Sequence, residues 1–260
     1  MTKPDVRVVL GTGASMFELA DRSVALVMTS PPYFPPAIDA VLVQGPPADA
    51  DLVALGDTVC DFAWSLRPVF DECVRVLAPG GRLVMQTRDV RLRHVRVPVE
   101  LIHRNLAEAA GLQLYSRHAW RSQRTTMSRR RMAAALESLV GPVSPDADAF
   151  LVFRMPGPFW LGDPTPQDID LLRRDVMLTP AGRMPARHPH QAPLPVLRAM
   201  IRAHSRPGDL VVDPFAGGAS SLRIAVELGR SAWGCEINPA TLELARYNLG
   251  TGLSRSAGQS

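Results

Sequence analysis

Two short apolar runs that end in loops of unusual composition constrain the fold of this chain more than any other feature. The run LVV at residues 210–212 ends at Asp213, and residues 213–221 then read DPFAGGASS. The run VALVM at residues 24–28 ends in TSPPYF at residues 29–34. Uninterrupted apolar runs of this length are typical of strands buried on both faces of a parallel sheet, and open α/β sheets bind ligands at the carboxyl ends of their strands. The chain is therefore predicted to be an α/β protein whose ligand site is formed by these two loops.

The rest of the chain alternates between strand and helix patterns. Further strands are predicted at residues 6–10, 82–86, 113–120, 149–155 and 232–236, and helices at residues 51–77, 97–110, 194–204, 220–228 and 239–249, with another starting at Thr165. Pro68 is expected to kink or split the first long helix. This alternation predicts a doubly wound, mostly parallel sheet in which the two strands between residues 113 and 155 form an antiparallel edge.

The length of 260 residues and a hydrophobic content of 46% predict a single domain over residues 1–255. Within it we expect a basic loop at residues 117–135 and a short recognition or connector segment at residues 157–190, followed by a disordered tail at residues 251–260. No apolar run approaches the ~20 residues that span a bilayer, so a cytoplasmic location without membrane contact is expected. Three scattered cysteines predict reduced thiols.

The DPFAGGASS loop has the composition of a cofactor-binding turn. Ala216, Gly217, Gly218 and Ala219 carry little or no side chain, and Ser220 begins a predicted helix, so a ligand can approach the backbone closely. Glu236 ends the next predicted strand, where an acid can accept both hydrogen bonds of a ribose diol. The pattern favours a nucleotide-like cofactor, with a simple packing turn beside a surface glutamate as the alternative.

The TSPPYF loop has the composition of a site for an amine. Pro31 and Pro32 fix the backbone and remove two donors, which leaves the carbonyl groups of Ser30 and Pro31 free to accept hydrogen bonds. Tyr33 and Phe34 offer flat faces on which an extruded base could stack. Acceptors that hold both hydrogens of an exocyclic amine would localise its lone pair and make the nitrogen reactive. The alternative is a proline turn with a buried tyrosine.

A basic segment suggests a polyanionic partner. Twelve arginines and only three acids lie between residues 82 and 131. The residues expected to contact phosphates are Arg117, Arg121, Arg124, Arg129, Arg130 and Arg131. An ordinary solvated surface remains the alternative. His188 and His190 lack an evident third ligand, so no metal site is predicted.

The order of these motifs resembles the amino-methyltransferases of DNA. TSPPYF precedes LAPGG at residues 77–81, His188-Pro189, DPFAGGASS and finally GCEINP at residues 234–239. This order is similar to the permuted β group, in which the catalytic motif comes before the cofactor motif. A serine in SPPY is typical of members that methylate cytosine at N4, whereas adenine-N6 members usually carry aspartate there.

The resemblance implies a Rossmann-like sheet of seven strands that binds S-adenosylmethionine. Asp213, Phe215 and Gly217 would line the methionine end of the cofactor, and Glu236 would hold the ribose. Ala216, Gly218 and Ser220 would also bind the cofactor. The loop Gly11-Thr12 would lie at the adenosine end, although the family usually has aspartate where this chain has Thr12. Ala219 replaces a usual glycine, so its methyl group could narrow the cofactor cleft. Residues 30–33 would hold the target base.

The function implied is direct methyl transfer to N4 of cytosine in double-stranded DNA, with the target base flipped and no covalent enzyme intermediate, as in restriction–modification enzymes. Three alternatives stay open: methylation of adenine N6, methylation of RNA or a small amine, and a catalytically weak nucleic-acid-binding relative. Assembly as a homodimer is a further option.

Overall fold

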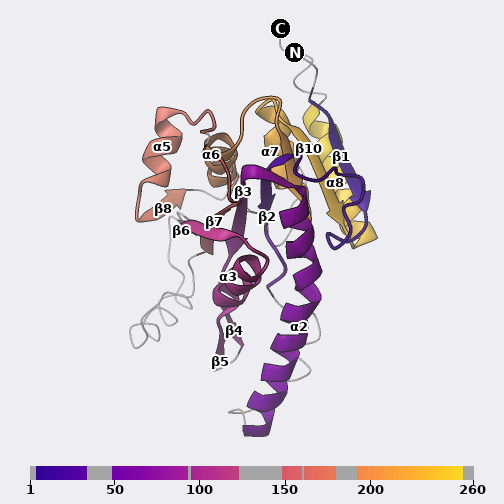
Figure 1. The fold of residues 1–260 in the computed structure, drawn as a ribbon, viewed down its shortest axis with the longest axis vertical. Helices are drawn as coiled ribbons and strands as arrows, with labels where there is room; N and C mark the ends of the chain where they lie inside the picture. Colours follow the sequence, from indigo (N-terminus) through magenta and orange to yellow (C-terminus); the bar gives the residue numbers. More distant parts are fainter. Residues whose placement is uncertain are drawn as a thin grey trace.

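The fold is described from a computed structural model over residues 4–33, 49–92, 95–122, 148–159, 161–179 and 192–253. An eight-stranded sheet forms its centre, with strand order β1-β10-β9-β2-β3-β7-β6-β8 (Figure 1). The strands of this sheet are β1 (Val6–Leu10), β2 (Val24–Thr29), β3 (Leu77–Thr87), β6 (Gln113–Ser122), β7 (Asp148–Arg154), β8 (Val176–Thr179), β9 (Leu210–Asp213) and β10 (Ser231–Glu236). A small antiparallel pair, β4 (Val90–Leu92) and β5 (Val95–Val97), stands apart.

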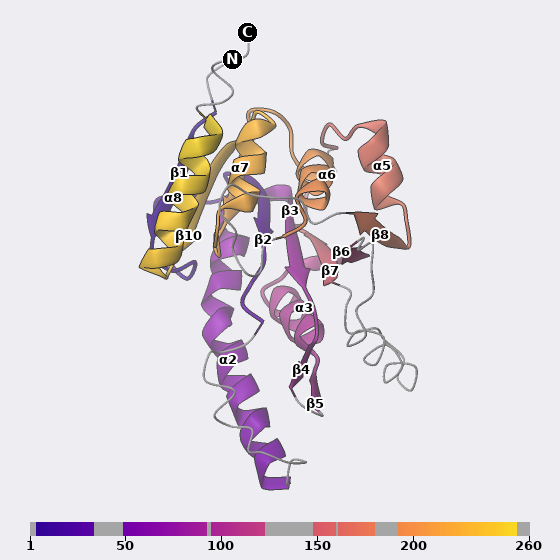
Figure 2. The same cartoon turned by 180° about the vertical axis from the view of Figure 1, so that it is seen from behind.

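Helices cover both faces of the sheet. They are α2 (Asp49–Val76), α3 (Val99–Ala109), α5 (Pro166–Leu172), α6 (Leu194–His204), α7 (Ser220–Glu227) and α8 (Pro239–Leu253). Helices α2 and α3 lie over one face (Figure 1), and α6, α7 and α8 lie over the other, as the reverse view in Figure 2 shows. None of the helices in the described ranges is long and apolar enough to cross a lipid bilayer. The predicted α/β architecture is therefore confirmed.

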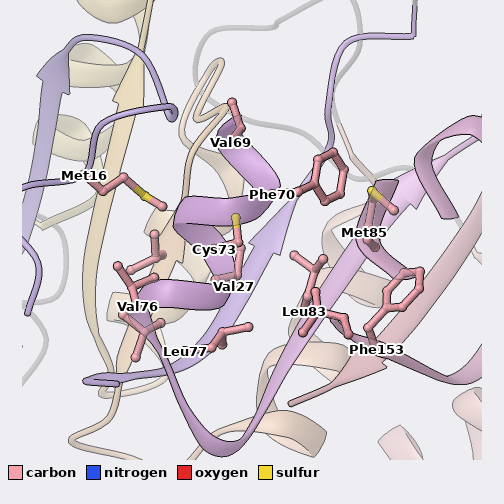
Figure 3. Packing of buried hydrophobic residues seen from close by; sticks show 14 of the residues in the cluster. Met16, Val27, Val69, Phe70, Cys73, Val76, Leu77, Leu83, Met85 and Phe153 are labelled. Carbon is pink, nitrogen blue, oxygen red and sulfur yellow. The ribbon is translucent and has the colours of Figure 1, made fainter. Parts of the chain in front are cut away.

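The strands are apolar on both faces because each face meets its own hydrophobic core. On the α2 side, Phe70 and Cys73 pack against Val27, Leu83 and Met85 (Figure 3). On the opposite side, buried residues of β2 and β3 pack against α6 and α7. Successive residues of a strand point to opposite faces, so a strand between two helical layers needs a continuous apolar run. This explains why the buried central strands could be predicted closely.

The sheet has eight strands rather than the seven expected. Strand β8 adds to β6 in parallel, with Ala119 opposite Val176 and Ser122 opposite Thr179. Trp120 fixes this edge because its Nε1 donates to Thr179 Oγ1 at 2.8 Å. The antiparallel strands β6 and β7 were predicted correctly, but β8 forms the edge beyond them.

The predicted starts of the basic loop and of the tail were wrong. The basic loop does not begin at residue 117, since residues 117–122 belong to β6; residues 123–135 lie outside the described part. The predicted connector at residues 157–190 contains α5 and β8, and α5 begins with a capping box between Thr165 and Asp168. Residues 251–253 of the expected tail continue α8, and residues 254–260 are not described.

Pro68 does not split α2, which runs as one helix from residue 49 to residue 76. A proline inside a helix leaves the carbonyl group four residues earlier without its usual donor. Here that residue is Trp64, whose surface is 71% exposed, so water can supply the missing hydrogen bond. The expected break is therefore avoided at a solvent-facing position.

Candidate functional site

The SPPY and DPFAGG loops meet in one cleft at the carboxyl ends of β2 and β9. The cleft opens to solvent. Its lining residues are Met28, Thr29, Ser30, Gln86, Ala192, Leu197, Asp213, Phe215, Ala216, Gly218, Ser220 and Ser221. Residues almost two hundred positions apart in the chain meet here because β2 pairs in parallel with β9, with Val27 opposite Val212. The two motifs singled out from the sequence thus share one site.

Asp213 ties the two loops together at the floor of the cleft. Thr29 Oγ1 donates to Asp213 Oδ1 at 2.7 Å, Ser221 Oγ donates to the other carboxylate oxygen, and the Phe215 amide donates to Oδ1 at 3.1 Å. Burial raises the pKa of the Asp213 carboxyl from 3.8 to about 6, although these three hydrogen bonds oppose the shift. The acid therefore fixes the relative position of the loops.

Glu236 organises the small-residue loop from the neighbouring strand β10. Its Oε2 accepts a hydrogen bond from the Gly217 amide at 2.9 Å, and its Oε1 accepts one from the Asn238 amide at 2.9 Å. A carboxylate offers about four acceptor positions, so it can still bind hydroxyl groups of a ligand. The amide of Gly11 donates to the Glu236 carbonyl at 3.1 Å, which places the predicted Gly11-Thr12 loop beside this acid.

The backbone of the small-residue loop is strongly curved. Gly217 and Ala219 both have positive φ, of 51° and 61°, and Asn248 Nδ2 donates to the Gly218 carbonyl at 2.9 Å from α8. The left-handed conformation disfavours Ala219 by about 1–2 kcal/mol relative to a right-handed residue. Ala219 is fully buried in the core under α6 and α7 and is absent from the cleft lining. Its methyl group therefore does not narrow the cleft, contrary to the sequence expectation.

Thr12 and Gly13 show how the β1 loop meets the cleft floor. Thr12 is exposed, and its Oγ1 accepts a hydrogen bond from the Ala14 amide at 3.2 Å. A Cβ atom on Gly13 would lie 2.6 Å from Pro214 Cβ, so only glycine allows this contact. The β1 loop is therefore packed directly against the DPF turn.

The SPPY loop is held by a buried histidine of α3. His103 lies within hydrogen-bond distance of the Pro32 carbonyl through Nε2, at 3.2 Å, and of Thr87 Oγ1 through Nδ1, at 2.9 Å. Burial lowers the pKa of His103 from 6.5 to about 4, so the ring is neutral near pH 7. Because a carbonyl oxygen only accepts, Nε2 donates to Pro32 and Nδ1 accepts from Thr87. No described residue donates to the carbonyl oxygens of Ser30 or Pro31.

Tyr33 forms the aromatic side of the SPPY loop. A hydrogen bond of 3.2 Å joins Tyr33 Oη to Ser30 Oγ, and the Arg88 guanidinium lies 5.2 Å from the ring centroid. Burial and the nearby Asp148 carboxylate raise the pKa of Tyr33 to about 12. The phenol therefore stays protonated and acts as a neutral ring with a polar end. Phe34 lies outside the described residues.

The predicted phosphate-binding arginines are only partly described. Arg117 and Arg121 lie on β6 and are exposed, but Arg117 forms an ion pair with Glu100 at 2.6 Å. That pair occupies the guanidinium, and the role of Arg117 as a phosphate ligand stays a prediction. Arg124, Arg129, Arg130 and Arg131 lie outside the described residues, as do His188 and His190.

Cysteine chemistry is disfavoured in the cleft. Cys73 and Cys235 are buried, and burial raises the pKa of both thiols, that of Cys235 to about 12. A protonated thiol is a poor nucleophile, so these cysteines are suited to packing. Among the described residues no cluster of three or more histidine, cysteine or acidic side chains could hold a metal ion.

Three side chains of the site were missed in the sequence. Thr29 links the two loops, His103 holds the Pro32 carbonyl, and Gln86 lines the cleft from β3. Thr29 and Gln86 are the polar residues that follow two apolar runs, which is a readable signal for the carboxyl end of a strand. His103 gave no such signal, because its role depends on how α3 packs.

Comparisons with known proteins agree with this geometry. Residues 24–246, well over half of the chain, match the N6_N4_Mtase family, described as DNA methylase. The DNA adenine methyltransferase YhdJ of Escherichia coli (strain K12) is 40% identical over 62 residues, which are 24% of this chain and 21% of that enzyme. The type II methyltransferase M.BglII of Bacillus subtilis is 23% identical over 254 residues, which cover 88% of this chain and 64% of that enzyme. The matched part of this chain thus spans less than two thirds of the length of either relative.

Solved structures share the fold. The TTHA0409 protein of Thermus thermophilus superposes with a TM-score of 0.69 at 24% identity over 95% of both chains, and a form of it complexed with S-adenosyl-L-methionine gives 0.68 at 24% identity over 96% of both. The cytosine-N4-specific PvuII DNA methyltransferase gives 0.68 at 17% identity, over 95% of this chain and 87% of that one. At these identities the likeness supports the fold alone. The match to the family over residues 24–246 shows that the chain belongs to the N6_N4_Mtase family of DNA methylases.

Proposed function

We propose that this chain is an S-adenosylmethionine-dependent DNA methyltransferase that modifies the exocyclic N4 amine of cytosine in double-stranded DNA. The observation that carries the proposal is the shared cleft, in which Ser30 and Phe215 are both lining residues and Thr29 is hydrogen-bonded to Asp213. One loop has the composition of a nucleotide site and the other that of an amine site. A reaction between a bound cofactor and an amine needs both in one place.

The residues of the β9–β10 side fit the cofactor. The small residues Ala216 and Gly218 line the cleft without blocking it, and Ser220 begins α7 at its edge. Glu236 retains acceptor capacity for two ribose hydroxyl groups, and the Gly11-Thr12 loop lies beside it. When bound, S-adenosylmethionine supplies an electrophilic methyl group on a sulfonium.

The residues of the SPPY loop would prepare the base. Its target would be flipped out of the duplex and stacked on Tyr33, and the carbonyl groups of Ser30 and Pro31 would accept the amine hydrogens. These acceptors localise the nitrogen lone pair as the amine attacks, which is stabilisation of the transition state by positioned dipoles. The raised thiol pKa values and this geometry favour direct transfer over a route through a cysteine adduct.

Cytosine is favoured over adenine because Ser30 stands where adenine-N6 members of the resembling group usually carry aspartate. Adenine N6 is the second candidate, since one relative with 40% identity over 62 residues is a DNA adenine methyltransferase. Both amines are attached to an aromatic ring and need the same acceptors.

Nucleoside mass spectrometry tests the proposal. Unmethylated genomic DNA is incubated with the protein and with S-adenosylmethionine carrying a deuterated methyl group, and the DNA is digested to nucleosides. We expect labelled N4-methylcytosine. Labelled N6-methyladenine would establish the second candidate instead, and absence of label from all nucleosides would reject DNA methylation. The Tyr33→Ala protein serves as a control for methyl transfer by a contaminating enzyme.

A further inference from the structure

Gln86 lines the cleft and carries an unused hydrogen-bond acceptor. It lies near the carboxyl end of β3, is 3% exposed and lines the cleft together with Ser30. Its Oε1 is buried and has no hydrogen-bond partner among the described residues. A buried carbonyl oxygen without a donor costs about 1–3 kcal/mol, and such groups in folded proteins usually have a partner. The missing donor is therefore expected to come from a ligand.

The neighbouring acid fixes which end of the amide meets the ligand. Gln86 Nε2 donates to Asp148 Oδ2 at 2.5 Å, and the other oxygen of Asp148 lies 3.8 Å from Arg88 Nη1. A carboxylate accepts hydrogen bonds and does not donate them, so it binds the amino end of the amide. A flip of the Gln86 amide, which exchanges its oxygen and nitrogen, would break this hydrogen bond. Asp148 therefore keeps Nε2 on its own side and leaves Oε1 as the free acceptor.

The place of Gln86 in the sheet separates it from the cofactor side. Strand β2 lies between β9 and β3, so Ser30 follows the strand between Asp213 and Gln86. The residues that fit the cofactor follow β9, β10 and β1, all on the far side of β2 from Gln86. An acceptor on β3 is therefore on the side where the substrate would enter.

We propose that Gln86 Oε1 accepts a hydrogen bond from the exocyclic amine of the target base and so selects bases that carry an amine at this position. The inference rests on the proposed function. An amine has two hydrogens: Gln86 Oε1 binds one of them, and the SPPY loop binds the other through the carbonyl group of Ser30 or Pro31. A thymine or uracil presents a carbonyl oxygen at the corresponding position, and two facing acceptors repel each other, so these bases are excluded.

The first variant removes the acceptor. Gln86→Leu keeps a side chain of similar size, and we expect kcat on genomic DNA to fall roughly 30-fold, because one hydrogen bond to the reacting amine is lost. The dissociation constant of S-adenosylhomocysteine, measured by calorimetry, should change less than twofold. Gln113→Leu is the matched control, since Gln113 is exposed on β6 and bonded to Arg154 away from the cleft. It should keep wild-type kcat.

The second variant restores the acceptor by exchanging the partners. In the Gln86→Glu/Asp148→Asn protein, the new asparagine donates to one oxygen of the new glutamate and leaves the other as the acceptor in the cleft. In this double variant, kcat for methyl transfer should recover to within about fivefold of wild type. In Asp148→Asn alone kcat should fall, because the amide of Gln86 can then flip and present its nitrogen instead of its oxygen. If Gln86→Leu does not fold, the double variant still tests whether an acceptor at position 86 is needed for methyl transfer.

The outcomes separate the two proposals. Wild-type kcat in Gln86→Leu, or an exchange protein no more active than Asp148→Asn, would overturn the role of Gln86 while leaving DNA methylation intact. A large loss of S-adenosylhomocysteine affinity with kcat retained would also overturn it, since the acceptor would then serve the ammonium group of the cofactor. An inactive wild-type protein would reject the proposed function and this role with it.

Discussion

The two walls of the cleft differ in how fully the chain satisfies its own polar groups. On the wall made by β9 and β10, Asp213 accepts three hydrogen bonds and both oxygens of Glu236 accept backbone amides. On the wall made by β2 and β3, Gln86 Oε1 and the carbonyl groups of Ser30 and Pro31 have no donor among the described residues. The carboxylates of the first wall already accept hydrogen bonds from the chain, although Glu236 keeps spare acceptor positions, whereas the acceptors of the second wall have no donor at all among the described residues.

This difference teaches how the two ligands would be recognised. A wall whose loop is already hydrogen-bonded can bind a cofactor with little rearrangement. A wall with unused acceptors favours a ligand that brings donors, and an exocyclic amine is such a ligand. The following changes test whether each wall acts on its own ligand.

The largest effect is expected at Glu236. In Glu236→Ala the ribose acceptors are lost and the amides of Gly217 and Asn238 lose their partner, so the dissociation constant of S-adenosylhomocysteine should rise about 100-fold by calorimetry. Glu236→Gln should weaken binding less. Glu243→Ala, which removes an exposed acid of α8, is the control and should bind normally. Unchanged affinity in Glu236→Ala would show that this wall does not hold the ribose.

The next effect is expected at Tyr33. Tyr33→Ala removes the stacking surface for the base, so kcat/KM for DNA should fall about 30-fold while cofactor affinity stays within twofold. Tyr33→Phe keeps the ring and loses the hydrogen bond to Ser30, so kcat/KM for DNA should fall about threefold. A loss of cofactor affinity in Tyr33→Ala would contradict the claim that each wall of the cleft binds its own ligand.

The two walls should also respond to pH in opposite directions. The pKa of Asp213 is raised to about 6, so the folded protein binds a proton more tightly there, and the contribution of Asp213 to stability falls as pH rises from 4 to 6. The pKa of His103 is lowered to about 4, so its contribution rises as pH rises from 4 to 6.5. Urea unfolding at several pH values would measure the difference in stability between wild type and Asp213→Asn, and between wild type and His103→Gln. Each difference should change by an amount on the order of 1 kcal/mol, with opposite signs. If both stability differences changed in the same direction with pH, the raised pKa of Asp213 and the lowered pKa of His103 could not both be correct.

The smallest effect is expected at Ala219. Its methyl group lies in the core and not in the cleft, so Ala219→Gly should change cofactor affinity less than twofold in calorimetry. The glycine relieves the strain of the left-handed backbone, which stabilises the protein, but the loss of a buried methyl group destabilises it, so the two effects on the free energy of unfolding oppose each other. A tenfold gain in affinity would mean that the methyl group does reach the cofactor.

The same two walls show what could be predicted from the sequence. Strands such as Val24–Thr29 and Leu210–Asp213 were located because a strand buried on both faces is apolar throughout. Strand β8 was missed because it has four residues, of which only Met177 and Thr179 are buried. Its existence depends on pairing with β6, which no local pattern reveals.

For the site, the loop motifs identified which residues could act, but not their partners. The Thr29–Asp213 and Gln86–Asp148 hydrogen bonds join residues 184 and 62 positions apart, and they require the strand order of the finished sheet. Arg117 was assigned to a basic loop, whereas the alternation of residues 113–122 placed it on a strand beside Glu100. Composition indicated the charge, and only the fold showed that this charge is paired.

The most direct test of the central claim is a crystal structure of the protein with S-adenosylhomocysteine, which needs no knowledge of the DNA sequence. We expect the ribose hydroxyl groups to bind Glu236 and the sulfur to face the SPPY loop beside Ser30, with the loop at residues 213–221 in its present conformation. A nucleoside bound elsewhere, or a sulfur directed away from Ser30, would contradict the claim that one wall holds the methyl donor and the other the amine.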